Sequence, residues 1–275
     1  MEKEKYIVCP ICRGGLKRCN SSLKCEGGHS YDLAKSGYVN LLNPGKKNNA
    51  KAGDSKEMIR ARTLFFQTGC YEGIKNALCD IASSLSPSVI IDAGCGEGYY
   101  TNSLAMTINN ALVFGFDMSK FGTEHASKQA RAKGLKSTLF SVSNIFDMPL
   151  ENECADLVVN MFAPVAIDEF RRTLRTGGHL IIGVAGVHHL EGLKRAIYDE
   201  VYLNEKFNDT YEGFVPVSVK SVKYSTTVNS SEAIWALFQM TPYFHRTSIA
   251  DKEKLLGLSS LTTEVEVDFY IFKKI

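Results

Sequence analysis

The sequence has no long apolar run, no internal repeat and no low-complexity tract. No hydrophobic stretch approaches the roughly 20 residues that a helix needs to cross a bilayer, and the first residues lack the pattern of a secretory signal peptide. We therefore expect a cytoplasmic protein with no membrane partner. With 275 residues, the chain can bury the core of one α/β domain of ordinary size and carry a small additional module.

The net charge is also small, because 32 Lys and Arg oppose 30 Asp and Glu, but the charges are unevenly distributed. Residues 1–62 carry thirteen basic and six acidic side chains, a net charge of +7, which leaves 19 against 24, or −5, for residues 63–275. A basic segment attached to an acidic body favours contact between that segment and a polyanion. Lysines on a solvated surface would give the same excess.

Four of the eight cysteines gather near the N-terminus, and the other four stand in scattered apolar contexts: Cys70, Cys79, Cys95 and Cys154. This distribution is typical of a metal site in a reducing compartment rather than of a disulfide framework. Cys9 and Cys12 form one pair of ligands, and Cys25 and His29 form a second pair after twelve intervening residues. Three thiolates and an imidazole suit a closed, tetrahedral structural Zn²⁺ site. Cys19 remains an alternative ligand.

A glycine loop is the central motif of the rest of the chain. A short, mostly β-branched strand leads through Asp92 into Gly94, Gly96 and Gly98, and residues 99–108 favour a helix. Glycine adopts backbone conformations that other residues avoid and lets a ligand approach the chain closely. The G-x-G-x-G spacing differs from the G-x-G-x-x-G that binds a dinucleotide pyrophosphate. It suits a nucleoside without phosphate, for which S-adenosylmethionine is the obvious candidate.

A second acid supports this interpretation. Residues 112–117 form another apolar strand that ends in Asp117, 25 positions after Asp92. In doubly wound sheets, a carboxylate at this place accepts hydrogen bonds from ribose hydroxyls. The loop that begins with Asn144 lies where such folds hold adenine. A glycine-rich turn with a helix-capping Asp is the simpler alternative, and the combined order of strand, loop, helix, strand and acid makes it less favoured.

Strands and helices alternate up to residue 184, which predicts a mostly parallel sheet with ligands at the carboxyl ends of its strands. The remaining expected strands span 138–142, 155–160 and 179–184, and the remaining helices span 55–69, 71–85, 122–133 and a segment through 172. His188 and His189 are expected to begin a long helix that ends near residue 203. The period-two patterns of residues 217–228 and 264–272 indicate antiparallel or edge strands, with a helix over 234–240 between them.

Taken together, these motifs resemble, nearly end to end, the bacterial 23S rRNA guanine-N1 methyltransferases of the RlmA/TlrB group. The resemblance rests on the zinc ligands, on residues 92–100, 32–42 and 53–58, on Ala61-Arg62, and on His189-Leu190 before Leu193-Lys194. It implies an α/β, class I S-adenosylmethionine-dependent methyltransferase: a Rossmann-like domain with a mostly parallel, seven-stranded sheet and a small N-terminal zinc-binding module. It also implies a homodimer that receives a hairpin of large-subunit rRNA.

The resemblance divides the chain into three parts. Residues 1–35, here called the zinc module, would bind Zn²⁺ and recognise RNA; residues 36–53 would be a basic linker; and residues 54–275 would be the methyltransferase domain. Lysines 46, 47 and 51 of the linker would be free to meet phosphates. Because the glycine loop lies on the other domain, we expect the zinc module to have little effect on cofactor affinity. The expected cofactor-binding residues are Tyr71, Asp92, Gly94, Gly96, Glu97, Gly98, Asp117, Asn144 and His189.

The catalytic residue is not assigned by the sequence. Guanine N1 carries a proton that must leave, so a proton acceptor is expected, and Asn160, His188, His189 and Glu97 are candidates by position. Two departures from the family pattern stand out: Gly73 replaces a proline, which we expect to loosen the lid near Tyr71, and Phe162 replaces a tyrosine. Two other functions remain open, a small-molecule methyltransferase with a zinc appendage and a non-catalytic rRNA-binding protein.

Overall fold

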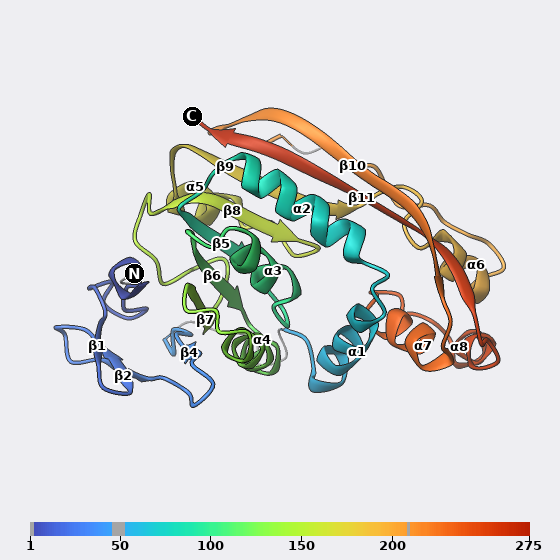
Figure 1. Ribbon diagram of the computed structural model, residues 1–275, viewed down its shortest axis with the longest axis horizontal. Helices are drawn as coiled ribbons and strands as arrows, with labels where there is room; N and C mark the ends of the chain where they lie inside the picture. Colours follow the sequence, from blue (N-terminus) through green and yellow to red (C-terminus); the bar gives the residue numbers. More distant parts are fainter. Residues whose placement is uncertain (1–2, 46–52, 208–209) are drawn as a thin grey trace.

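The computed structural model describes residues 3–45, 53–207 and 210–275, and its core is one large sheet (Figure 1). The strands lie in the order β10 (Phe214–Val228), β11 (Leu261–Lys274), β9 (Leu174–Ala185), β8 (Ala155–Met161), β5 (Val89–Ala93), β6 (Leu112–Asp117), β7 (Thr138–Val142) and β4 (Val39–Asn40). The strands from β9 to β4 pair in parallel, whereas β11 pairs antiparallel with both β9 and β10. This confirms the mostly parallel α/β sheet with an antiparallel C-terminal pair.

Seven of these strands come from the predicted methyltransferase domain, and the eighth comes from the predicted linker. In β4, Val39 pairs with Ser141 and Asn40 with Val142 of β7. The described part of the 36–53 segment therefore joins the sheet instead of running freely between two domains. Lysines 46, 47 and 51 lie outside the described residues.

Helices cover both faces of the sheet. They are α1 (Lys56–Gln67), α2 (Glu72–Ser84), α3 (Tyr99–Thr107), α4 (Lys120–Ala132), α5 (Ile167–Thr173), α6 (Glu191–Ile197), α7 (Ser231–Gln239) and α8 (Ile249–Leu256). The N-caps of α1, α4, α7 and α8 are serines, a residue type favoured at this position, whose side chains accept a hydrogen bond from a backbone amide of the first turn: Ser55, Ser119, Ser230 and Ser248.

The long helix expected from His188 to residue 203 is wrong, because only Glu191–Ile197 is helical there. Lys194 explains the early end: its ammonium donates to the carbonyl of Tyr202 at 3.0 Å and to Asn204 Oδ1 at 2.7 Å. The following segment is therefore folded back against α6 and cannot continue its axis.

The alternation of side chains along β5 separates two hydrophobic cores. Ile90 belongs to a core that includes residues of α1, α2, α3 and α7, whereas Ile91 belongs to a core that includes α5 and the zinc module. None of the helices within the described ranges is long and apolar enough to cross a membrane.

The zinc module has a short 3₁₀ helix, η1 (Lys3–Tyr6), and an antiparallel sheet of β1 (Lys17–Cys19), β2 (Ser22–Lys24) and β3 (Ser30–Asp32). Its chain is attached to the larger domain by backbone bonds: Val8 N donates to Pro149 O and Glu151 N to Tyr6 O, both at 3.0 Å. Apolar residues of the module share one core with β5 and β6. The module is therefore an integral part of the folded body.

Candidate cofactor and metal sites

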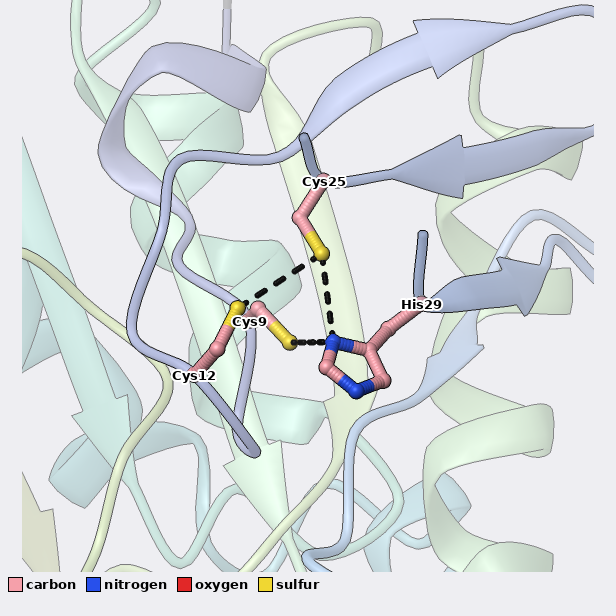
Figure 2. Close-up of side chains that lie close together, drawn as sticks. All are labelled: Cys9, Cys12, Cys25 and His29. Atoms are coloured by element: carbon pink, nitrogen blue, oxygen red, sulfur yellow. Dashed lines mark hydrogen bonds between the residues drawn. The ribbon is translucent and has the colours of Figure 1, made fainter. Parts of the chain in front are cut away.

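The four predicted metal ligands come together at one end of the zinc module (Figure 2). Their ligand atoms all lie within 4.8 Å of one another, with 3.6 Å between the Sγ atoms of Cys12 and Cys25 and 3.3 Å from Cys25 Sγ to His29 Nδ1. A tetrahedral Zn²⁺ with Zn–S bonds of about 2.3 Å separates its sulfur ligands by about 3.8 Å. The described cluster thus fits a Cys₃His zinc site, and Cys19 is not part of it.

The surroundings of Cys9 favour the thiolate that a metal needs. Burial opposes ionisation of its thiol, but the Tyr31 hydroxyl, 3.1 Å from Sγ, and the backbone amides of Cys12 and Ile11 outweigh this effect and lower the pKa of Cys9 to about 6. A thiol with this pKa gives up its proton readily at neutral pH, so the ligand is prepared for Zn²⁺.

The glycine loop has the tight geometry that its sequence predicts. Gly94, Gly96 and Gly98 have φ angles of 90°, 53° and 83°, in the left-handed region. A Cβ on Gly94 would lie 2.5 Å from the Cβ of Ala163, in the loop that follows β8. A Cβ on Gly98, the N-cap of α3, would lie 2.5 Å from that of Ala126 in α4. The first and third glycines therefore allow other chain segments to approach.

Two cavities of about 590 Å³ each meet at this loop. The first cavity is lined by the predicted residues Tyr71, Gly94, Glu97 and His189. The second cavity is lined by the predicted residues Gly94, Gly96, Asp117 and Asn144. Both share a wall made of Arg62, Gly94, Met161, Phe162 and Ala163. Asp92 and Gly98 line neither cavity and support the loop from within.

The two predicted acids are fixed by different partners. Asp117 accepts hydrogen bonds from Gly96 N at 2.9 Å and from Ser119 N at 2.6 Å, which leaves further lone pairs for a ligand in the second cavity. Asp92 Oδ2 accepts a hydrogen bond from Thr101 Oγ1 at 2.5 Å, and burial raises the pKa of Asp92 to about 7. Burial also raises the pKa of Asp117.

Glu97 and Arg62 form a charged pair in the wall between the cavities. Arg62 Nη1 lies 3.6 Å from Glu97 Oε2, and Arg62 Nε lies 3.0 Å from Asp54 Oδ2. Burial raises the pKa of Glu97, although the neighbouring Arg62 opposes this shift. Arg62 belongs to a stretch that carries the family resemblance, but its position in α1 gave no sign that it would reach the glycine loop.

His189 and Tyr71 are joined by a hydrogen bond of 2.9 Å between Nε2 and the hydroxyl. His189 Nδ1 accepts a hydrogen bond from Glu266 N at 3.2 Å, so the imidazole proton is on Nε2 and is donated to Tyr71. The Tyr71 hydroxyl keeps its own proton for a ligand in the first cavity. Burial lowers the pKa of His189 to about 4, so the ring is neutral at pH 7.

Comparison with known proteins agrees with this architecture. The family model "RlmA, N-terminal", a zinc ribbon, matches residues 7–51, and the model "Methyltransferase domain" matches residues 85–227. A 23S rRNA (guanine(748)-N(1))-methyltransferase of Streptomyces fradiae is 32% identical over 198 residues, which cover 70% of this chain and 68% of the relative. The chain belongs to the 23S rRNA (guanine-N1)-methyltransferase family.

One of two further relatives extends the match over nearly the whole chain. YxjB of Bacillus subtilis (strain 168), whose name assigns it provisionally to the same class of enzyme, is 29% identical over 284 residues, which cover 97% of this chain and 96% of that protein. A Micromonospora griseorubida protein, provisionally named in the same way, is 30% identical over 206 residues and 67% of each chain.

The residues of this methyltransferase suit S-adenosylmethionine. Several buried oxygen atoms around the glycine loop have no hydrogen-bond partner within the described residues: Asp92 Oδ1, Glu97 Oε2, Tyr100 Oη and Asn160 Oδ1. Glu97 and Tyr100 line the first cavity, so their oxygens fit a ligand that brings a hydrogen-bond donor there, as the ammonium of S-adenosylmethionine does. Asp92 and Asn160 line neither cavity. The cofactor is expected for the methyltransferase family and has room across the two cavities.

Of the four candidate bases, Glu97 lines the first cavity, with Oε2 3.6 Å from Arg62 Nη1. The other three present no free proton acceptor to the cavities. Both nitrogens of His189 are engaged, which argues against His189 as the base. Asn160 donates its amide to Ala93 O at 2.8 Å and to Pro164 O at 3.2 Å and thereby positions the loop after β8. His188 Nδ1 lies 2.8 Å from Glu191 Oε2, and His188 lines neither cavity.

Sequence reasoning missed the segment that completes the first cavity. Met240, Thr241, Pro242, Tyr243 and His245 all line it. They follow α7, which packs on α1, and no local pattern marks a segment that reaches a site only through such packing. The ring of His245 is exposed and has no hydrogen bond to the rest of the described chain.

Phe162 occupies a special position between the cavities. Its φ is 52°, unusual for a residue with a large side chain, and its ring is 40% exposed while facing that of His189 at 6.0 Å and 26°. Gly73, where the family often has a proline, instead makes room for Tyr224: a Cβ there would lie 2.6 Å from its ring. Tyr224 also donates to Cys70 O at 2.8 Å, so the start of α2 is held by this contact rather than loosened.

Proposed function

We propose that this protein transfers a methyl group from S-adenosylmethionine to N1 of a guanine in a hairpin of 23S rRNA. The single observation that carries the proposal is the family membership over nearly the whole chain, which joins an RlmA-type zinc ribbon to a methyltransferase domain. The geometry supports it, because the described residues include the four zinc ligands and the two cavities that meet at the glycine loop.

The two cavities assign different parts of the cofactor to different residues. We place the adenosine in the second cavity, where Asp117 accepts from the ribose and Asn144 begins the adjoining loop. The amino acid part would lie in the first cavity, where Glu97 offers an acceptor and Tyr71 a donor. S-adenosylmethionine, when bound, supplies an electrophilic methyl group. The chain's own contribution is then positioning, since methyl transfer needs in-line geometry and little covalent help.

Guanine N1 is hidden inside a base pair, so the target base must be unpaired or extruded. The part of the first cavity between Phe162 and the Met240–His245 segment is our candidate pocket for it, because Phe162 offers an exposed aromatic face for stacking. His245 is our candidate acceptor for the N1 proton, since it lines the first cavity and no hydrogen bond within the described structure occupies its ring nitrogens.

Two further parts of the proposal concern partners. We expect residues 1–35 to contact the rRNA, and we place the enzyme in the cytoplasm, where ribosomal RNA is found. We also expect a homodimer, as the family resemblance implies. The long outer strand β10 offers a surface for it, because Val217 and Val219 are 53% and 54% exposed. Sedimentation velocity at micromolar concentration tests this point: a monomer at all concentrations would contradict it.

Primer extension on 23S rRNA treated with the protein tests the proposed reaction. Methylation of N1 blocks the Watson–Crick edge, so reverse transcription should stop one nucleotide before the modified guanine. Methylation of small molecules in an RNA-free extract, with no stop on rRNA, would favour a small-molecule enzyme. Binding of rRNA with no binding of S-adenosylmethionine would favour a non-catalytic RNA-binding protein.

A further inference from the structure

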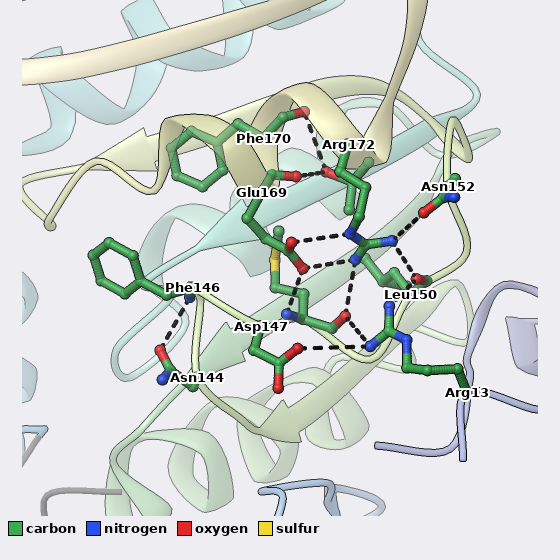
Figure 3. A network of polar contacts seen from close by, with 11 residues as sticks. Arg13, Asn144, Phe146, Asp147, Leu150, Asn152, Glu169, Phe170 and Arg172 are labelled. Carbon is green, nitrogen blue, oxygen red and sulfur yellow. Dashed lines mark hydrogen bonds and ion pairs between the residues drawn. The ribbon is translucent and has the colours of Figure 1, made fainter. Parts of the chain in front are cut away.

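We propose that Arg13 of the zinc module is a positioning residue for the cofactor, so that the zinc site and the S-adenosylmethionine site are energetically coupled. The inference rests on the proposed function, because it places adenosine in the second cavity. It differs from the expectation that the zinc module serves RNA alone and leaves cofactor affinity unchanged. The link is the 144–150 loop: it begins at Asn144, which lines the second cavity, and ends at Leu150, whose carbonyl accepts from Arg13 of the zinc module (Figure 3).

Arg13 is tied directly to the metal ligands. It follows Cys12, its backbone amide donates to Cys9 O at 2.8 Å, and its φ is 60°. These constraints close a tight turn, and a metal bound by Cys9 and Cys12 would fix that turn from the other side. The direction of the Arg13 side chain is therefore set by the geometry of the metal site.

The Arg13 guanidinium donates hydrogen bonds to the C-terminal end of the 144–150 loop. Nη1 donates to Met148 O at 3.2 Å and Nη2 to Leu150 O at 3.1 Å, and Nη1 lies 3.9 Å from Asp147 Oδ1 (Figure 3). Two carbonyls two residues apart are a good match for the fixed fork of a guanidinium, which a single ammonium does not reproduce. Arg13 thus holds both ends of one short turn.

The same two carbonyls are held from the opposite side by the methyltransferase domain. Arg172 of α5 donates to Met148 O at 3.0 Å and to Leu150 O at 2.8 Å, while Glu169 accepts from Met148 N at 2.6 Å (Figure 3). The loop is therefore clamped between two arginines. Two contacts tie this turn to the zinc module: the Arg13 side chain and the backbone bond of 3.0 Å from Val8 N to Pro149 O.

The clamped turn continues into the wall of the second cavity. Asn144 Oδ1 accepts from Phe146 N at 3.0 Å, and Asn144 O accepts from Asp147 N at 3.0 Å. Asn144, Ile145 and Phe146 line the cavity together with Asp117. A displacement of residues 147–150 would change this wall, so Arg13 acts on the cofactor through the loop and without touching it. Coupling of this kind is reciprocal: cofactor binding must tighten the zinc site by the same factor.

Calorimetric titration of the zinc-loaded, full-length protein with S-adenosylmethionine tests the coupling. Arg13→Ala should weaken binding about fivefold, which is the size of one net hydrogen bond. Arg13→Lys should weaken it similarly, because it keeps the charge but not the fork. Lys17→Ala is the matched control: it removes a cation of the same module whose partner, Glu26, is exposed, and it should leave affinity unchanged. Zinc content should stay at one ion per chain in all three variants.

A second measurement reads the reciprocal effect. S-adenosylhomocysteine should slow the transfer of zinc from the wild-type protein to a chromogenic chelator, and it should slow it much less in the Arg13 variants. In steady-state assays of the Arg13 variants, the KM for S-adenosylmethionine should rise relative to the wild-type protein, whereas kcat and the KM for rRNA should remain unchanged.

Several outcomes would overturn the proposal. Unchanged cofactor affinity in Arg13→Ala with zinc retained would do so. A rate of zinc transfer from the wild-type protein to the chelator that is the same with and without S-adenosylhomocysteine would also do so. A loss confined to rRNA affinity and restored by Arg13→Lys would make Arg13 a phosphate contact instead. If Arg13→Ala loses its zinc, the cofactor affinity of Arg13→Lys becomes the test: an unchanged affinity in that variant, with zinc retained, would overturn the proposal. Absence of cofactor binding by the wild-type protein would refute the proposed function itself, which keeps the two failures distinguishable.

Discussion

Replacing Gly94 with alanine should damage the cofactor cradle through two separable effects. The φ of 90° lies outside the range that alanine prefers, and the left-handed conformation costs an L-residue about 1–2 kcal/mol. The new Cβ would also lie 2.5 Å from Ala163 Cβ, whereas carbon atoms in contact stay about 3.5–4.0 Å apart. Overpacking of this kind costs about 1–3 kcal/mol. Gly94→Ala should therefore lower the free energy of unfolding by about 2–5 kcal/mol.

Gly134→Ala is the matched control, because Gly134 has a φ of 70° but no heavy atom within 4 Å of an added Cβ. Its free energy of unfolding should fall only by the cost of the left-handed backbone conformation, about 1–2 kcal/mol. Urea unfolding measures both values, and calorimetry should show cofactor affinity at least tenfold weaker in Gly94→Ala alone, since Gly94 lines both cavities. Adding Ala163→Gly to Gly94→Ala removes the Cβ that the new side chain meets, and it should recover the part of the free energy of unfolding that was lost to overpacking. Equal losses in Gly94→Ala and Gly134→Ala would refute the close approach of the loop after β8.

Three further predictions follow from individual side chains. Asp117→Ala should weaken S-adenosylmethionine binding at least tenfold in calorimetry, because hydrogen bonds to a charged acceptor are worth about 1.5–3 kcal/mol each; unchanged binding would contradict the ribose assignment. His245→Ala should lower kcat and leave cofactor affinity unchanged, and an unaltered kcat would exclude His245 as the proton acceptor. The pKa of His189 is about 4, below about 6.5 in the unfolded chain, so the unfolded state gains a proton first as the pH falls. His189 should therefore lower the free energy of unfolding by about 3 kcal/mol between pH 8 and pH 4, whereas the raised pKa of Asp92 acts in the opposite direction. The contribution of His189 is the difference between the pH dependences of the wild-type protein and His189→Gln.

The features that the sequence predicted correctly are those with a short-range signature. The zinc cluster follows from two pairs of closely spaced Cys and His ligands, and the parallel sheet follows from alternating apolar strands and helices. Family, fold, cofactor and zinc are all confirmed by the comparisons. The roles of individual cofactor-binding residues, the homodimer and the cytoplasmic location stay predictions.

The features that the sequence did not predict depend on contacts between distant residues. The proton of His189 is placed by the amide of Glu266, 77 positions later, and α6 ends early because Lys194 binds Asn204 in a segment with no pattern of its own. Arg13 contacts carbonyls 135 and 137 positions away. A carbonyl carries no side-chain information, so no local pattern could reveal that the zinc module and the cofactor loop share hydrogen bonds.

Primer extension on 23S rRNA tests the central claim most directly. The rRNA should be incubated with the full-length, zinc-loaded protein and S-adenosylmethionine, with Asp117→Ala protein as the matched control. We predict a strong stop one nucleotide before a single guanine of a hairpin, greatly reduced with the variant and absent without the cofactor. An rRNA with no new stop, despite calorimetric binding of S-adenosylmethionine by the same protein preparation, would contradict the account.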